Sequence, residues 1–324
     1  EVYLQSMDFA HAWMLGLIPT EEIYRELMGR VNSPTRIKDI TSALDEHNHS
    51  LFHSLTQKVV NRILEIELQR GDSETQVTRL AEELHRVYGA ETLIRILQAF
   101  GKDTFIRDSY NWRNTKRGVL SSLLHACYPS TDDDSDTLKS LANQADISHI
   151  RLVEAAMFAP QWLELTEKAT GWKGLESAAY YFHAHTSECF DDKKKAIIAR
   201  YTPIAIEDLQ EGAFDIDWFK EAYKTIGKER FEVVYNAAKY ISLSNTHTRA
   251  RKFADAVNGK TKAADAKKEI IAKRNKDLLM SYGLIPLGRK ADKELLERYQ
   301  FLQKFLKESK EFGAQRQESE KIGR

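Results

Sequence analysis

The sequence predicts an all-α protein, an elongated multi-helix array of the HEAT-like α-solenoid or a related helical-repeat type. Three observations predict this class. The 324 residues include only 6 prolines and 15 glycines, fewer turn-forming residues than sandwiches and barrels use. The intervals 35–128 and 204–285 contain no proline, a residue that helix interiors exclude. Apolar residues recur at helical spacing, and no segment shows the period of two that marks a strand.

The N-terminal helices are predicted from caps and periodicity. Thr20 and the two glutamates after it suit a helix start, because acids stabilise the positive end of a helix. Apolar residues at steps of four predict a helix over 51–70, which Gly71 ends. Two further helices are each closed by a glycine: 75–88 by Gly89 and 91–100 by Gly101.

Two C-terminal segments show the clearest amphipathic pattern. Each places apolar residues on one helical face with charges between them. In 227–243 that face consists of Phe231, Val234, Tyr235, Ala238 and Ile241. In 291–311 it consists of Leu295, Tyr299, Leu302 and Leu306. Both segments are therefore predicted to form amphipathic helices.

Breaks in the pattern divide the chain. Proline, serine and a run of acids predict an acidic linker loop at 128–136, between helical segments at 1–127 and 137–312. The stretches 259–266 and 283–290 interrupt helices within the second segment. Residues 313–324 have no apolar face and are predicted to fray or to lead into a further domain. Since the chain begins at Glu1, we interpret it as a piece of a longer protein.

The compartment is predicted from cysteine usage and from the absence of a leader. Two distant cysteines, Cys127 and Cys189, favour the reducing cytoplasm over a secreted disulfide scaffold. No basic-then-apolar leader opens the chain. The longest apolar stretch, 13–19, is far shorter than the ~20 residues that span a bilayer.

Charge is balanced overall but unevenly distributed. The chain has 48 Lys/Arg and 48 Asp/Glu, which removes the simplest reason to expect a nucleic-acid binder. Residues 251–324, however, contain 19 Lys/Arg against 11 Asp/Glu. The excess is densest at 251–276, which is either a partner-binding patch or a solvated, salt-bridged helix surface. The candidate partner-binding residues are Arg251, Lys252, Lys267, Lys268, Lys273 and Arg274.

Motifs for catalysis, metal or nucleotide binding are not convincing. His49 and His53 share a helical face, but Glu46 and His47 supply no evident third zinc ligand. His183 and His185 are two residues apart and point in different directions on a helix, and a buried thiol is the simpler interpretation of Cys189. The acids at 132–136 lack the glycine and glutamate of an EF-hand, and there is no P-loop or GxGxxG sequence. We therefore predict no catalytic residues, metal or cofactor.

A cluster of aromatic residues has two interpretations, a ligand groove or the inner faces of packed helices. The helical core is the favoured one. The residues are Trp162, Trp172, Tyr180, Tyr181, Phe182 and Phe190.

Three stretches resemble the large bacterial proteins labelled MolR-like, which are largely uncharacterised. They are WLELTEKATGWKGLESAAYYFHAHTSE at 162–188, the phrases from ERFEVVYNAAKYIS to KRNKDLLMSYGLIPL at 229–287, and ELLERYQFLQKFLKESKEFGAQRQESE at 294–320. The resemblance covers about half of the chain. It implies a middle, helical-repeat segment of a much longer protein and supplies no active-site residues. We see no helix-turn-helix signature that would support a transcriptional regulator.

These observations predict a non-catalytic scaffold or protein-interaction segment of a larger bacterial protein. Its partner would be another protein or other domains of the same polypeptide, with no membrane involved. The alternative is a nucleic-acid-binding regulatory module that uses 251–276. An enzyme domain completed by another part of the protein stays open as a third hypothesis.

Overall fold

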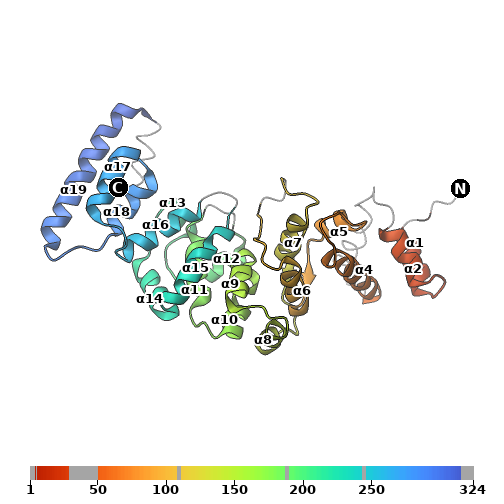
Figure 1. Cartoon of the computed structure of the whole chain (residues 1–324). Helices are drawn as coiled ribbons and strands as arrows, with labels where there is room; N and C mark the ends of the chain where they lie inside the picture. The colour runs from red at the N-terminus through yellow and green to blue at the C-terminus, as the bar shows by residue number, and fades with distance from the viewer. Residues whose placement is uncertain are drawn as a thin grey trace. The chain divides into compact units, whose positions relative to one another are not determined.

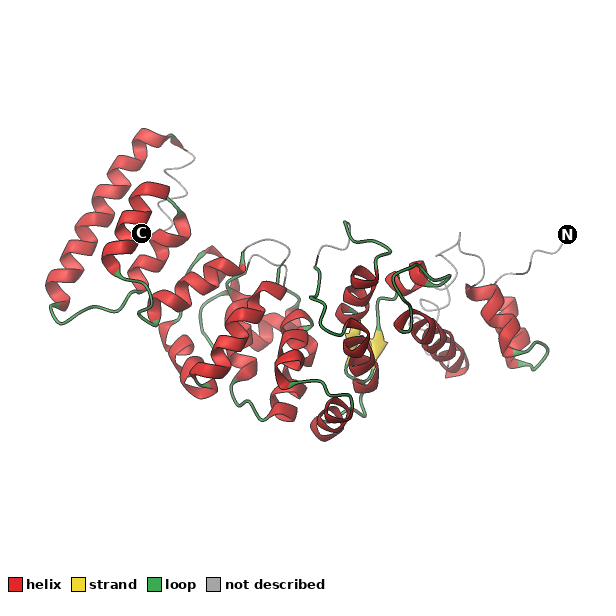
Figure 2. Cartoon of the chain, in the orientation of Figure 1, coloured by secondary structure: helices red, strands yellow, loops and turns green. Residues whose placement is uncertain are grey.

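A computed structural model describes residue 4 and residues 6–28, 50–107, 111–186, 190–242 and 246–314, without the side chains of 6, 7 and 50–53. Within these ranges the backbone is helical except for loops and two strands of two residues each (Figures 1 and 2). The all-α class predicted from the sequence is confirmed. The chain divides into two compact units, Glu1–Thr170 and Gly171–Arg324. A HEAT-like repeat remains a prediction.

The described helices of the first unit are mostly short. In chain order its elements are α1 (Ser6–Met14), α2 (Thr20–Met28), α4 (Ser50–Leu68), α5 (Thr78–Glu82), β1 (Val87–Tyr88), α6 (Ala90–Phe100), α7 (Lys116–His125), β2 (Cys127–Tyr128), α8 (Ser135–Gln144), α9 (His149–Phe158), the 3-10 turn Pro160–Trp162 and α10 (Leu163–Thr170). The predicted helices at 51–70 and 91–100 and the start at Thr20 are confirmed.

α6 is the central helix of the first unit and packs against α7 and α8. Its leucine and isoleucine side chains are buried, as its amphipathic sequence requires. Gly101 ends the helix with φ of 54°, a left-handed conformation that glycine adopts without a Cβ clash. Trp162 is also fully buried, and its Nε1 donates to the carbonyl of Cys127 at 2.7 Å.

The predicted helix at 75–88 is shorter in the structure, because Val87 and Tyr88 form a parallel pair with Cys127 and Tyr128. The amide of Val87 donates to the carbonyl of Ala126 at 2.9 Å, which requires extended backbone. Two-residue strands are too short to show an alternating pattern in the sequence, so they were not predicted.

The acidic loop at 128–136 lies inside the first unit, since the units divide after Thr170. Asp133 accepts hydrogen bonds from the amides of Ala90 and Ser130, at 2.9 and 2.7 Å. Asp134 caps α8 by accepting from the amide of Thr137 at 2.7 Å. Asp133 and Asp134 thus attach this loop to the N-termini of two helices. The acidic composition of 128–136 did not distinguish such an attached loop from a free linker.

All the regular secondary structure described in the second unit is helical. Its elements are α11 (Leu175–Ala184), α12 (Asp192–Ile198), α13 (Ile206–Glu211), α14 (Ile216–Ile226), α15 (Lys228–Ala237), the 3-10 turn Ala238–Tyr240, α16 (His247–Val257), α17 (Ala263–Lys273), α18 (Lys276–Leu284), α19 (Ala291–Glu308) and the 3-10 turn Ser309–Phe312. The predicted breaks at 259–266 and 283–290 coincide with the starts of α17 and α19.

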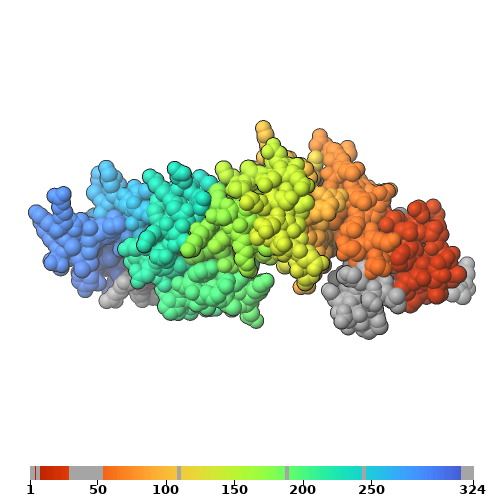
Figure 3. Space-filling model, turned by 90° about the horizontal axis from the view of Figure 1, so that it is seen from below, coloured from red at the N-terminus to blue at the C-terminus, as the bar shows by residue number. Residues whose placement is uncertain are grey.

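α11 forms the core of the second unit and contacts α14, α15 and α16. Tyr180, Tyr181 and Phe182 on this helix are buried, which confirms the core interpretation of these aromatics. The hydroxyl of Tyr181 donates to the carbonyl of Ala250 at 2.8 Å, so its polar end is satisfied. Trp172 and Phe190 are only half-buried. Figure 3 shows the side-chain surface of the described residues from below, with the second unit running from green to blue.

α19 folds as predicted but turns a different face inward. Arg298, Phe301 and Phe305 are buried, whereas Leu295 and Tyr299 are 57% and 58% exposed. Phe301 and Phe305 join a small core with residues of α16, α17 and α18. Leu295 and Tyr299, which belong to the apolar face read from the sequence, are therefore not covered within this unit. Two apolar stripes alternate along this helix, and only the neighbouring helices decide which of them is covered.

Candidate functional site

The six predicted partner-binding residues lie in three places. Arg251 and Lys252 are on α16, Lys268 and Lys273 are on the exposed surface of α17, and Lys267 and Arg274 face α19. The structure therefore does not gather them into one basic face.

Arg251 holds two helices of the second unit together. Its Nε donates to the carbonyl of Tyr235, and its Nη2 donates to that of Asn236, each at 2.9 Å. The guanidinium also lies 4.9 Å from the centre of the Tyr235 ring. Burial lowers the pKa of Arg251 from its usual value. The hydroxyl of Tyr235 in turn donates to Asp255 at 2.8 Å, so the side chains form one network.

The basic residues of α17 and its C-terminal cap differ in their partners. Lys273 forms an ion pair with Glu269 one turn earlier on the same helix. Lys268 is exposed and makes no ion pair within the described part of the chain. Arg274 stacks its guanidinium on Phe305 and Phe312, at 4.0 and 4.2 Å from the ring centres, and donates to the carbonyl of Phe305. Of these cations, Arg274 mainly fastens α17 to the end of α19.

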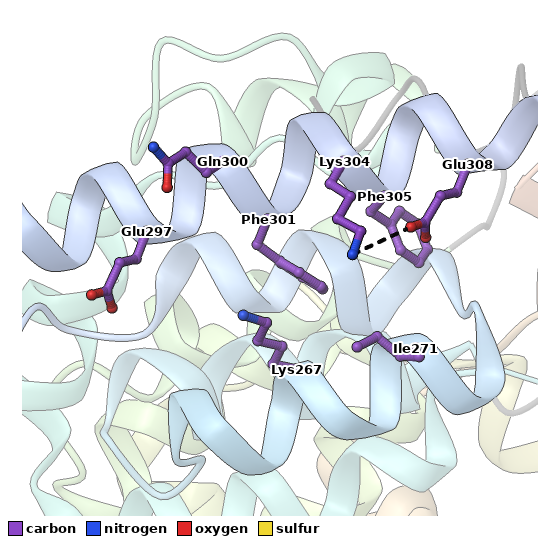
Figure 4. A pocket seen from close by; sticks show the side chains of 8 residues that line it. All are labelled: Lys267, Ile271, Glu297, Gln300, Phe301, Lys304, Phe305 and Glu308. Carbon is purple, nitrogen blue, oxygen red and sulfur yellow. Dashed lines mark ion pairs between the residues drawn. The ribbon is translucent and has the colours of Figure 1, made fainter.

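An open groove of about 440 Å³ lies between α17 and α19, and we call it the α17–α19 groove. Lys267 and Ile271 rise from α17 toward side chains of α19 (Figure 4). The lining residues are Lys267, Ile271, Glu297, Gln300, Phe301, Lys304, Phe305 and Glu308. Lys267 is the one predicted partner-binding residue among them. The aromatic rings of Phe301 and Phe305 lie 34 residues beyond Lys267 and Ile271 in the chain, so the sequence of 251–276 gave no signal of them.

The charges in this groove are unevenly matched. Glu308 pairs with Lys304 at 3.8 Å, and Glu297 pairs with Lys293 of the same helix at 3.8 Å. The Lys267 ammonium lies over the Phe301 ring, 4.9 Å from its centre, and has no carboxylate partner among the described residues. A cation over an aromatic face gains only about 0.5–1 kcal/mol at an exposed site. The groove therefore combines an apolar floor with an ammonium group available to an incoming carboxylate.

A second hollow of about 510 Å³ lies in the first unit beside the start of α7. Its lining mixes acids with bases: Asp72, Glu74, Asp103, Arg113, Lys116 and Arg117, together with Trp112, Asn114 and Thr115. The side chain of Thr115 caps α7 by accepting from the amide of Gly118. This mixture selects neither an anion nor a cation.

Within the described residues, the candidate histidines His183 and His185 do not form part of a metal-ligand cluster. The described residues contain no group of three or more potential ligands. The ring nitrogens of His185 lie against the carbonyls of Tyr181 and Ala213, at 2.8 and 3.2 Å. His183 is buried in the core of the second unit. Glu46, His47, His49, the side chain of His53 and Cys189 lie outside the described residues.

Fold and site together define a helical protein whose second unit has an open groove between two helices. The chain belongs to DUF5724, a family of unknown function, whose profile matches residues 1–323. No curated protein and no solved structure matches the chain. None of the described helices is both long enough and apolar enough to cross a membrane.

Proposed function

We propose that this chain is a non-catalytic helical interaction segment, and that the α17–α19 groove binds an acidic amphipathic helix of a protein partner. The single observation that carries the proposal is the combination in this groove of exposed apolar surface with the unmatched Lys267. Ile271 is 58% exposed, so an apolar partner side chain gains free energy by covering it.

The dimensions of the groove suit a short helix. Lys267 and Ile271 are one turn apart on α17, and Phe301 and Phe305 are one turn apart on α19. From Glu297 to Glu308 the groove follows α19 for about 16 Å, at about 1.5 Å per residue. A partner helix of about three turns fits this length, with apolar residues at i, i+4 and i+7 facing the groove.

The test uses two synthetic helical peptides and the 324-residue chain. One labelled peptide carries leucines at i, i+4 and i+7 flanked by glutamates, and in the other every glutamate is a lysine. We expect the acidic peptide to bind at least about tenfold more tightly in fluorescence anisotropy, because only its carboxylates match Lys267. Equal binding of the two peptides would contradict the proposal.

Matched variants locate the binding. Lys267→Glu is expected to raise the dissociation constant of the acidic peptide about tenfold. Lys268→Glu makes the same change of charge on the next residue, outside the groove, and is expected to weaken binding much less. If both variants weaken peptide binding equally, the two lysines contribute only long-range electrostatic attraction, and the groove is not the binding site.

The alternative, a nucleic-acid-binding module at 251–276, has weaker support. Arg251 donates to backbone carbonyls and Lys273 is paired with Glu269, so these two cations are engaged within the chain and less available to phosphates. Measuring the binding of labelled duplex and single-stranded DNA in the same anisotropy assay decides between the two functions. Tight, salt-sensitive DNA binding that Lys268→Glu reduces would favour the alternative.

The wider setting is also proposed from the sequence. The phrases shared with MolR-like proteins support a segment of a larger bacterial protein of that type, and the two cysteines support a cytoplasmic location. Fractionation of source cells, followed by detection of the intact polypeptide, tests both statements.

A further inference from the structure

α19 has an apolar surface separate from the α17–α19 groove. Leu295, Tyr299, Leu302 and Leu306 follow one another at intervals of four, three and four residues, and we call them the α19 stripe. This is the spacing of the a and d positions of a coiled coil, where two helices pack side by side. At about 100° per residue, the α19 stripe lies about a quarter turn from the buried Phe301 and Phe305, on the side away from the groove.

The described helices leave the N-terminal half of this stripe uncovered. Leu295 and Tyr299 are more than half exposed, and the neighbouring Leu296 is 55% exposed. Leu302 and Leu306 are half-buried, and Leu302 packs against the small core. Three large apolar side chains exposed on two adjacent turns are more than isolated surface residues, and such patches mark interaction sites.

The charges beside the stripe show which kind of helix fits against it. Along its solvent side lie Asp292, Leu296, Gln303 and Lys307, at intervals of four, seven and four residues. Asp292 near the start of α19 and Lys307 near its end are exposed and opposite in charge. The two positions between them are uncharged, so nothing on this side repels an apolar partner. A helix of opposite direction with the same charges would place a lysine beside Asp292 and an aspartate beside Lys307.

We propose that two copies of this chain associate through their α19 stripes, packed antiparallel about a twofold axis. Leu295 of one copy then lies opposite Leu306 of the other, and Tyr299 lies opposite Leu302. Asp292 lies beside Lys307 of the second copy, and the symmetry repeats each contact. A parallel pair would instead place the two copies of Asp292, and likewise those of Lys307, on opposite sides of the seam, so neither of these two oppositely charged contacts would form. The contact is one helix wide, so we expect a concentration-dependent dimer rather than an obligate one.

The first test is the mass of the full chain across a concentration series, by sedimentation velocity. We expect a monomer–dimer equilibrium. Tyr299→Glu is expected to raise the dissociation constant at least about tenfold, because it places a charge in the apolar seam of both copies. Ala272→Glu, at an exposed position of α17 away from the stripe, is the matched control and is expected to leave the equilibrium unchanged. Circular dichroism checks that both variants keep the helical fold.

The second test establishes the direction of packing by cysteine cross-linking. Leu296→Cys combined with Gln303→Cys is expected to give a cross-linked dimer on oxidation, because antiparallel copies bring these two positions together. Either substitution alone is expected to cross-link far more slowly, since like positions lie about seven residues, or roughly 10 Å, apart along the axis. The unsubstituted chain is the control for cross-linking through the native cysteines Cys127 and Cys189.

Two results would overturn the proposal. One is a monomer at every concentration, with no cross-linking of the double variant. The other is cross-linking of Leu296→Cys alone that is as fast as that of the double variant, which the proposed antiparallel register excludes. The outcome is independent of peptide binding in the α17–α19 groove, because Lys267→Glu leaves the stripe intact.

Discussion

His185 is held between two backbone carbonyls and three aromatic rings in the second unit. Its Nδ1 and Nε2 lie 2.8 and 3.2 Å from the carbonyl oxygens of Tyr181 and Ala213. The rings are those of Tyr181, Phe214 and Phe253. Burial lowers the pKa of His185 to about 4, although both carbonyl contacts favour the proton, and Arg249 lowers it further.

This depressed pKa predicts that acid destabilises the protein. The ordinary histidine pKa of 6.5 applies when the chain is unfolded, so the unfolded state binds the proton more tightly than the folded state. The contribution of His185 to the unfolding free energy is fully present above pH 6.5 and is lost as the pH falls toward 4. A difference of two and a half pKa units corresponds to about 3 kcal/mol of unfolding free energy. Urea unfolding at a series of pH values measures it.

Two variants isolate the contribution of His185 to this pH dependence. His185→Gln removes the titrating group, so the loss of stability between pH 6.5 and 4 is expected to become shallower. The exposed His149, changed to glutamine, serves as the control and is expected to keep the slope of the unmodified chain. An unchanged slope in His185→Gln would assign the acid sensitivity to other groups.

At the scale of elements, Arg298 fixes the orientation of α19. The side chain of this residue is 6% exposed, and its Nη1 donates to the carbonyl of Ile285 at 2.6 Å. Its Nη2 donates to the carbonyl of Pro286 at 3.3 Å and pairs with Glu294. These contacts satisfy carbonyls just after α18, where the helix itself provides no donors. Arg298 therefore satisfies carbonyls at the end of α18 and determines which face of α19 is buried.

Arg298→Met is expected to lower the unfolding free energy by about 3 kcal/mol, because it leaves buried carbonyls without donors. Lys293→Ala removes a cation from the same helix, but its pair with Glu297 is exposed. We expect it to change stability by less than about 0.5 kcal/mol. Chemical denaturation of both variants makes the comparison. Equal effects would show that Arg298 does not clamp the end of α18.

At the scale of the whole molecule, the zero net charge conceals two units of opposite sign. Residues 1–170 contain 18 Lys/Arg and 25 Asp/Glu, whereas residues 171–324 contain 30 and 23. An acidic partner is therefore attracted to the second unit, where the α17–α19 groove lies. Pairing of the α19 stripes depends mainly on apolar contact instead.

Salt is expected to separate these two interactions. Raising the ionic strength from 0.1 to 1 M shortens the Debye length from about 10 to about 3 Å. We expect the acidic peptide to associate at least about tenfold more slowly, while the dimer dissociation constant changes by less than about threefold. Stopped-flow fluorescence and sedimentation measure the two quantities. A common salt dependence would mean that one electrostatic surface serves both.

The sequence by itself determined the helical class and the positions of most helices. Glycine caps such as Gly101, the spacing in 227–243 and the lack of proline act locally, so a short stretch of chain decides them. Phe231, Val234, Ala238 and Ile241 are indeed buried together. The basic excess at 251–276 was also visible, although not the division of its residues among three places.

Other features depend on contacts between distant parts of the chain, and only the tertiary structure decided them. The end of the predicted helix at 75–88 depends on pairing with Cys127, some 40 residues away. The inward face of α19 depends on Arg298 reaching carbonyls after α18, because Leu295 and Tyr299 belong to a second apolar stripe that stays exposed. The α17–α19 groove exists because Lys267 and Phe301 meet across two helices. Periodicity records which residues share a face, but not which neighbour covers it.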